Sequence, residues 1–147
     1  MRKALLAIFL LFSFNLYGAG AKIDIPKYDW SWKGFFGTYD RASAQRGLKV
    51  YREVCAGCHS MNYLSYRNLA DLGFSEDHIK AIAAEHLVLD GPNDEGEMFE
   101  RDGIPSDQFV NPYLNENAAR AANNGAYPPD LSLIVKARPK GADYIKA

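Results

Sequence analysis

Cysteine is scarce in this sequence, because the 147 residues contain only two, Cys55 and Cys58. A disulfide between them would close almost no loop, which excludes a role as a structural staple. Charge is nearly balanced, since 17 basic and 18 acidic residues give a formal net charge of −1. No positive excess therefore indicates a nucleic-acid partner. The hydrophobic fraction of 48% and the aromatic fraction of 13% are typical of a folded globule rather than a disordered chain.

Long apolar runs are missing apart from one at the amino end. Basic residues precede an apolar stretch over 4–14, and small residues follow at 19–21. This order is typical of a secretory signal, so we interpret residues 1–21 as a signal peptide that is cleaved before Lys22. An uncleaved membrane anchor is disfavoured, because the stretch is shorter than the ~20 apolar residues that span a bilayer. We expect the mature part, 22–147, to be exported, and its length is enough for one domain with a core.

Helical periodicity in the mature part predicts an all-α domain. The expected helices lie at 41–54, 63–72, 75–87, 116–124 and 130–137, and a last one begins at 142. Asp40, Ser75 and Asn115 are suited to cap three of them. The aromatic residues of 22–40 indicate an extended arm that packs its rings onto the domain. Repeated Gly and Pro residues between 89 and 111 indicate a long surface loop.

The first expected helix carries an apolar face and one unusual residue. Leu48, Tyr51 and Cys55 fall on one face at helical spacing. Gly47 either weakens this helix mildly or allows another element or a ring to approach where a side chain would not fit. Both interpretations remain open from the sequence.

The two cysteines belong to the segment Cys55-Ala56-Gly57-Cys58-His59. Two thiols at this spacing reach one edge of a haem and add across its vinyl groups, and the adjacent His lies under the iron. In an exported protein the segment predicts one covalent haem c, held by Cys55 and Cys58, with His59 as the metal ligand. The competing interpretation, a thioredoxin-like redox pair, requires a preceding strand and a βαβ context, whereas a helix is expected before this motif.

A second axial ligand for the iron is not evident. Met61 lies two residues from His59 and therefore on the same side of the haem. Met98 lies in an acidic, Gly-rich loop, and His78 and His86 fall on an expected helix. We expect each of these to be an ordinary residue rather than a ligand, although Met and His are the usual choices in electron-transfer haems.

Two groups of charged residues stand apart from the motif. Haem propionates need a charged partner when they are buried. Arg138 is the best candidate for this partner, and Arg120 is the second. The simpler interpretation of each is a solvated Arg at the end of a helix. Residues 90–102 hold six acids and one base. Such a run is usually a solvated loop, and the alternative is a docking surface that steers a basic carrier protein toward the haem.

Three separated blocks of the sequence resemble, in order, blocks of the cytochrome c1 family. They are 46–61 (RGLKVYREVCAGCHSM), 90–99 (DGPNDEGEMF) and 118–138, which contains AARAANNGAYPPDLS and ends in KAR. The second and third blocks separate this family from generic soluble cytochromes c. The chain thus resembles the haem c subunit of the quinol–cytochrome c oxidoreductase, the cytochrome bc1 complex, from about residue 25 to its last residue.

The resemblance implies a fold and roles for particular residues. The domain would be a class I cytochrome c fold with a long loop excursion. Cys55 and Cys58 would hold the haem, His59 would be its proximal ligand, and Arg138 matches a residue that binds a propionate. The residues that match those lining the haem pocket are Asn123, Pro128 and Pro129.

The resemblance also implies a place in a respiratory chain. The protein would take one electron at a time from a Rieske iron–sulfur protein, beside cytochrome b, and pass it to a cytochrome c, without catalysing bond chemistry itself. The family continues past 143–145 into a part with the axial Met and a membrane helix, so we expect this chain to be incomplete at its C-terminus. Membrane association would then come through the complex or the missing helix. The alternatives are a free-standing periplasmic cytochrome c, a thiol–disulfide oxidoreductase, and a haem-based gas sensor or peroxidase-like enzyme.

Overall fold

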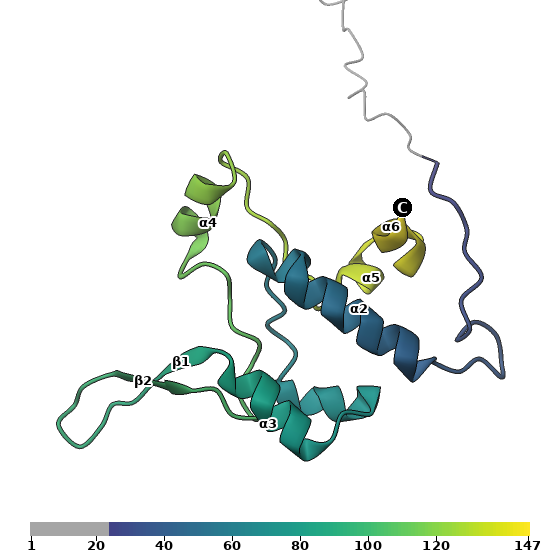
Figure 1. Cartoon of the computed structure of the whole chain (residues 1–147). Helices are drawn as coiled ribbons and strands as arrows, with labels where there is room; N and C mark the ends of the chain where they lie inside the picture. The colour runs from purple at the N-terminus through teal and green to yellow at the C-terminus, as the bar shows by residue number, and fades with distance from the viewer. Residues whose placement is uncertain (1–23) are drawn as a thin grey trace, which may run out of the picture.

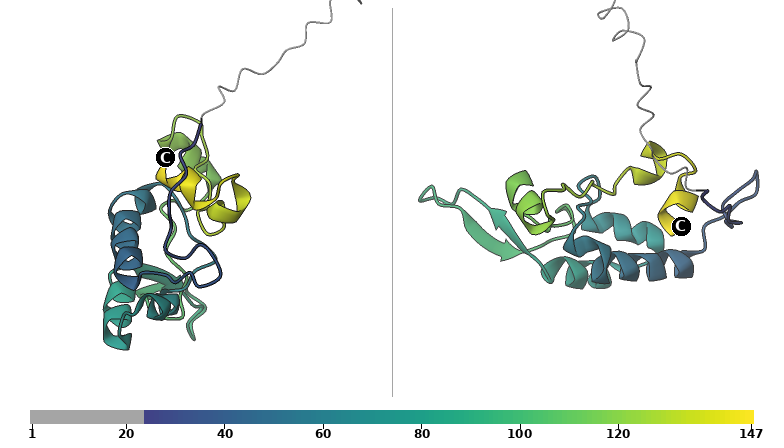
Figure 2. Two further views of the ribbon diagram at one scale, coloured as in Figure 1. Left: turned by 90° about the vertical axis from the view of Figure 1, so that its right-hand side faces the viewer. Right: turned by 90° about the horizontal axis from the view of Figure 1, so that it is seen from above.

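The computed structural model of the chain describes residues 24–147 (Figure 1). The predicted signal peptide, 1–21, lies outside the described residues, so it stays a prediction. An extended arm leads into helix α2 (Arg41–Glu53), and a hairpin extends from the middle of the chain. The hairpin and the arm lie at opposite ends of an elongated molecule (Figure 2).

Helix α2 confirms the predicted first helix almost to the residue. Its amino end is capped by Asp40, whose side chain accepts a hydrogen bond from an amide of the first turn. Tyr51 on the inner face is buried, and Leu48 packs against the core beside it. A Cβ built at Gly47 would meet no atom within 4 Å, so the close-contact interpretation finds no support among the described residues.

Two helical segments pack below α2 in Figure 1: the 3₁₀ helix η2 (Tyr66–Leu72) and α3 (Glu76–Ala84). Ser65 begins the first with a reciprocal capping box, and the side chain of Ser75 caps the second. Gly73 ends η2 with a φ of +89°, a left-handed conformation that glycine adopts without a steric penalty. These segments confirm the predicted second and third helices, with α3 ending before the expected residue 87.

The core lies where these three segments meet. Its buried members are Tyr51, Tyr66, Leu69, Ile79, Ile82, Ala83 and Phe109. The ring of Phe109 stacks on Tyr66 with centroids 4.7 Å apart and meets Tyr51 edge-on at 5.9 Å. The aromatic rings therefore join the loop after the hairpin to both α2 and η2.

The all-α prediction is wrong in one region. Strand β1 (Leu87–Asp90) pairs antiparallel with β2 (Phe99–Asp102), so part of the predicted surface loop over 89–111 is a hairpin. Both strands have only four residues, and Leu87 and Leu89 are 59% and 65% exposed. Because neither face is fully buried, the sequence lacks the alternation that indicates a strand. The described domain is therefore mainly helical and carries a small two-stranded sheet.

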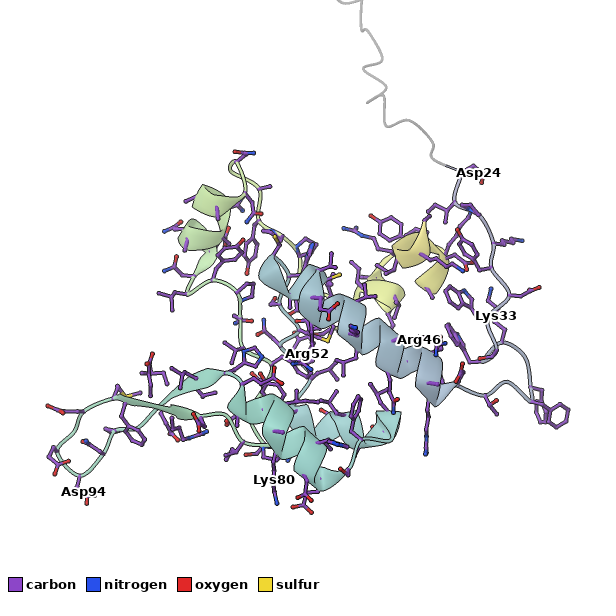
Figure 3. All side chains as sticks on the ribbon, in the orientation of Figure 1. Asp24, Lys33, Arg46, Arg52, Lys80 and Asp94 are labelled. Carbon is purple, nitrogen blue, oxygen red and sulfur yellow. The ribbon has the colours of Figure 1, made fainter. Side chains whose placement is uncertain are left out.

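Charged pairs fasten the base of the hairpin. Arg101 of β2 pairs with Asp90 of β1 and, at 2.7 Å, with Asp107 in the following loop. Gly103 lets the chain pass close to α3, since a Cβ there would lie 2.5 Å from the carbonyl oxygen of Ala83. The hairpin is therefore fixed at its root, while its acidic tip, with Asp94, lies far from α2 (Figure 3).

Three short helices form the rest of the chain: α4 (Glu116–Ala122), α5 (Ile134–Ala137) and α6 (Ala142–Lys146). Asn115 caps α4 as predicted. Gly125, with a φ of +86°, follows its end, and its amide donates to the carbonyl of Arg120. Helix α5 begins four residues later than the predicted 130, because the preceding residues are engaged in the contacts described below.

The arm packs part of its aromatic side chains onto the carboxyl end of the chain. The rings of Trp30, Trp32 and Tyr39 stack in series at 4.6 and 5.0 Å. The indole Nε1 of Trp30 donates to Asp143 of α6 at 2.6 Å. Phe35, at the tip of the arm, is 96% exposed, so the prediction that the rings pack onto the domain holds for only some of them. No helix among residues 24–147 is long and apolar enough to cross a membrane.

Candidate functional site

The cysteine motif follows directly on the carboxyl end of α2. The chain tightens there into a 3₁₀ turn, η1 (Cys55–Gly57), and the amides of Cys58 and His59 both donate to the carbonyl of Cys55, at 3.1 and 2.8 Å. Cys55 packs against the core, whereas Cys58 is exposed, and both thiols are free. The turn therefore presents two thiols and an imidazole within five consecutive residues.

The imidazole of His59 is held by a residue distant in sequence. Its Nδ1 lies 2.7 Å from the carbonyl oxygen of Pro129. A carbonyl oxygen only accepts, so Nδ1 carries the proton and donates it. In the neutral ring, Nε2 is then unprotonated and free to bind a metal, which is the arrangement that fixes metal-binding histidines in proteins.

Asp130, next along the chain, joins the two segments that meet at His59. Its carboxylate accepts hydrogen bonds from the hydroxyl of Ser60, the amide of Asn62 and the amide of Ser132, each at 2.8 Å. Burial alone would raise the pKa of this carboxyl above the ordinary 3.8, but the hydrogen bonds from Ser132, Asn62 and Ser60 outweigh burial and lower the pKa to about 2. Asp130 is therefore ionised and firmly held.

Tyr51 connects the site to the core from the other side. Its hydroxyl donates to the carbonyl oxygen of His59 at 3.3 Å. Burial, followed by the nearby negative charge of Asp130, raises the pKa of Tyr51 to about 12. The phenol is neutral at physiological pH and serves as a donor that restrains the backbone of the motif.

The other predicted site residues lie at varying distances from the motif. Pro128 lines a small cavity of about 90 Å³ together with Cys58. Asn123 donates to the carbonyl of Ala119 at 2.7 Å, which satisfies a free carbonyl near the end of α4. Arg138 follows α5, where its guanidinium lies 5.8 Å from the centre of the Tyr144 ring. Of the four residues carried over by resemblance, only Pro129 makes a hydrogen bond to the motif among the described residues.

The Met and His side chains that were considered as second axial ligands lie in different parts of the described chain. Met61 packs against the core, and Met98 is 54% exposed in the hairpin. The Nδ1 of His78 lies 3.1 Å from the hydroxyl of Ser75 at the start of α3. His86 falls beyond the end of α3, and its ring stacks on Tyr66.

The side chains at the motif fit a metal ion that is already coordinated by a macrocycle. Within residues 24–147, no group of three or more His, Cys, Asp or Glu side chains converges to hold a bare metal ion. One imidazole nitrogen and two thiols on the same turn instead match a haem, whose porphyrin supplies the four equatorial nitrogens. The free thiols of Cys55 and Cys58 and the oriented Nε2 of His59 are the groups that such a haem requires.

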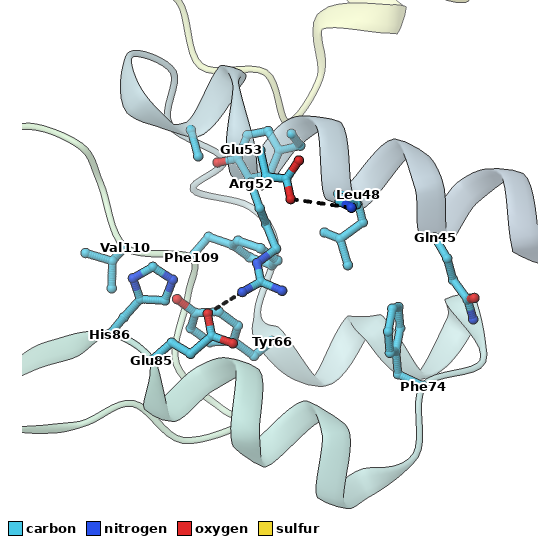
Figure 4. A pocket seen from close by; sticks show the side chains of 13 residues that line it. Gln45, Leu48, Arg52, Glu53, Tyr66, Phe74, Glu85, His86, Phe109 and Val110 are labelled. Carbon is cyan, nitrogen blue, oxygen red and sulfur yellow. Dashed lines mark hydrogen bonds and ion pairs between the residues drawn. The ribbon is translucent and has the colours of Figure 1, made fainter.

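A larger cleft, of about 480 Å³, lies between α2 and the root of the hairpin (Figure 4). The ion pair between Arg52 and Glu85 crosses it, and the stacked rings of Tyr66 and Phe109 form part of its wall. Ala56 of the motif lines this cleft, whereas Cys55, Cys58 and His59 do not.

Sequence reasoning missed Asp130, Ser132 and Tyr51 as parts of the site. The Asp-x-Ser spacing after a Pro-Pro pair signals a local turn in which the aspartate accepts the amide two residues on. Nothing local indicates that Ser60 and Asn62 also donate to this carboxylate, because they lie 70 and 68 residues away in the chain.

Comparison with known proteins supplies the family context for this geometry. The model of the Cytochrome C1 family matches residues 30–147. Cytochrome c1 of Rhodospirillum rubrum is 55% identical over 123 residues, covering 84% of this chain and 45% of the relative.

Two eukaryotic proteins match at a similar level. "Cytochrome c1 1, heme protein, mitochondrial" of Arabidopsis thaliana is 56% identical over 125 residues, covering 85% of this chain and 41% of the relative. "Cytochrome b-c1 complex catalytic subunit, mitochondrial" of Candida albicans is 53% identical over 120 residues, covering 82% and 42%. The chain thus spans less than half the length of these relatives.

Proposed function

The chain belongs to the cytochrome c1 family, and we propose that it binds one covalent haem c and carries electrons through it as the haem subunit of a bc1 complex. A haem bound at this site supplies a one-electron couple between its ferrous and ferric states. The chain's own residues attach it and orient its proximal ligand.

The contact between His59 and Pro129 is the observation that carries the proposal. The carbonyl of Pro129 accepts from Nδ1 at 2.7 Å, which leaves Nε2 as the nitrogen that would bind the iron. The thiols also lie at the carboxyl end of α2, the negative end of its dipole, whereas reactive thiolates are typically stabilised at the amino end of a helix.

Attachment needs no oxidant. Each thiol, on Cys55 and on Cys58, adds across one vinyl group, so that a carbon–sulfur bond forms and the thiol hydrogen passes to the other vinyl carbon. The turn formed by 55–57 keeps both sulfurs on one short segment, and no disulfide joins them. The proposed metal ligand is His59.

The remaining residues carried over by resemblance receive supporting roles. Pro128, beside the cavity that Cys58 lines, and Pro129 would cover the proximal side of the haem. Asn123 would line the pocket from the end of α4, and Arg138 would pair with a propionate.

We place the protein on the periplasmic side of a bacterial inner membrane, in a respiratory chain. The electron donor would be a Rieske iron–sulfur protein, cytochrome b would be a neighbouring subunit, and a cytochrome c would be the acceptor. The hairpin supports a basic acceptor, because its exposed tip carries Asp94, Glu95 and Glu97. A free-standing periplasmic cytochrome c is the second candidate, since the chain shares the motif with such carriers.

Haem retention tests attachment directly. The exported chain is produced in a host that attaches c-type haem and is then extracted with acidified acetone, which removes haem that is not covalently bound. We expect the haem to stay with the wild-type chain and to be lost when both cysteines are replaced, in Cys55→Ser/Cys58→Ser. Free thiols at full stoichiometry in the wild type would instead favour the thiol–disulfide oxidoreductase.

Co-purification separates the two candidate carriers. A tagged chain that brings down a cytochrome b and a Rieske protein from detergent-solubilised membranes supports the subunit. A haem-bearing chain found only in the soluble periplasmic fraction, without either partner, supports the free carrier and contradicts membership of the complex.

A further inference from the structure

Two segments that lie far apart in the sequence are joined by hydrogen bonds next to the motif. They are 60–63, which directly follows His59, and 129–132. The amide of Leu131 donates to the carbonyl of Ser60 at 2.9 Å, and the amide of Tyr63 donates to the hydroxyl of Ser132 at 3.0 Å. We call 129–132 the strap. Its first residue, Pro129, supplies the carbonyl that accepts from His59.

Asp130 occupies the centre of this junction, and its two carboxylate oxygens have different tasks. Oδ1 accepts from the amide of Ser132, which closes a turn inside the strap. Oδ2 accepts from the hydroxyl of Ser60 and from the amide of Asn62, both on the opposite segment. One carboxylate therefore sets both the shape of the strap and its register against the chain that follows His59.

The register of the strap decides where the Pro129 carbonyl points. This carbonyl belongs to the peptide unit that ends at the nitrogen of Asp130, so its direction follows the backbone of Asp130. With φ of Pro129 limited by its ring, the main remaining freedom is the rotation that the Asp130 carboxylate restrains through its partners on the other segment.

We propose that Asp130 is a positioning residue for the proximal ligand: by holding the strap against 60–63, it keeps the Pro129 carbonyl on Nδ1 of His59 and so sets the orientation and basicity of Nε2. The inference rests on the proposed haem attachment. It assigns to Asp130 a role that acts through Pro129, without contact to the iron.

The test uses the full chain with its haem and the variant Asp130→Asn. The substitution keeps the size of the side chain but replaces one carboxylate oxygen with an NH₂ group. This NH₂ group would then face another hydrogen-bond donor, which is either the amide of Ser132 or the amide of Asn62. The matched control is Asp107→Asn, because Asp107 also accepts several bonds, from Arg101 and from the amide of Ile104, but lies at the root of the hairpin.

Two measurements are made on each protein. Hydrogen exchange of peptides covering 60–63 and 129–132 reports how tightly the strap is held, and we expect exchange to become about tenfold faster in Asp130→Asn, in line with the loss of a hydrogen bond to a charged group. The iron–histidine stretching band in the resonance Raman spectrum of the five-coordinate ferrous haem, formed by photolysis of its carbon monoxide complex, reports the hydrogen bond at Nδ1. We expect it to shift to lower frequency and broaden in Asp130→Asn, and to stay unchanged in Asp107→Asn.

The possible results are distinguishable. An unchanged iron–histidine band in Asp130→Asn overturns the inference, whether or not the strap exchanges faster, because the carboxylate would then have a structural role only. If Asp130→Asn does not fold, Ser60→Ala removes one donor to the same carboxylate, and a smaller shift in the same direction is required. Absence of haem from the wild-type chain contradicts the proposed function itself, which separates the two failures.

Discussion

Acidification should erase the contribution that Asp130 makes to stability. The pKa of this carboxyl is about 2 in the folded chain, against an ordinary 3.8. A group whose pKa is lower in the folded state stabilises the fold above its ordinary pKa, and this stabilisation disappears as the pH falls through the folded value. A difference of just under two pKa units, at about 1.4 kcal/mol each, corresponds to about 2 kcal/mol at neutral pH.

The assay is urea unfolding of the wild type and Asp130→Asn at a series of pH values. Other groups titrate in both proteins, so the difference between the two free energies of unfolding isolates Asp130. We expect this difference to be constant at neutral pH and to shrink by about 2 kcal/mol between about pH 6 and about pH 2. A difference that stays constant down to pH 2 would refute the claim that the hydrogen bonds from Ser60, Asn62 and Ser132 hold an ionised carboxylate.

Three further substitutions test particular contacts. Gly47→Ala should raise the free energy of unfolding by about 0.5–1 kcal/mol, measured in urea, because alanine favours a helix and the added Cβ meets open space; a loss of stability would show that something fills that space. Gly103→Ala should lower it by about 1–3 kcal/mol, because the Cβ would lie 2.5 Å from the carbonyl oxygen of Ala83. Asp143→Ala should release the arm, detected as a red shift in tryptophan fluorescence and faster proteolysis near Trp30, whose indole donates to this carboxylate. Unchanged emission would show that the arm is held by other contacts.

Features that depend on neighbouring residues could be predicted from the sequence. The caps at Asp40, Ser75 and Asn115 each accept a hydrogen bond from an amide two or three residues away, so residue type and spacing sufficed to find them. The same is true of the motif at 55–59, where covalent chemistry fixes the spacing. The existence of α3 followed from its helical period.

Features that depend on residues distant in the sequence could not be predicted. The hairpin was missed because its strands are short and largely exposed and the segment between them contains Gly and Pro, so tertiary contacts such as those of Arg101 decide its formation. The role of Asp130 was missed because its partners Ser60 and Asn62 lie 70 and 68 residues earlier in the sequence. Resemblance identified Pro129 as a pocket residue, and the structure adds the atom through which it contacts His59.

The central claim is that Cys55, Cys58 and His59 form the attachment site of one haem, and the mass of a single peptide tests it most directly. Trypsin releases the segment between Arg52 and Arg67, which contains all three residues. We predict that this peptide, isolated under denaturing conditions from the exported chain, carries the added mass of one haem, and that replacing both cysteines with serine removes it. A peptide of unmodified mass from the wild type, produced in a host that attaches haem to a control cytochrome c, would contradict the account.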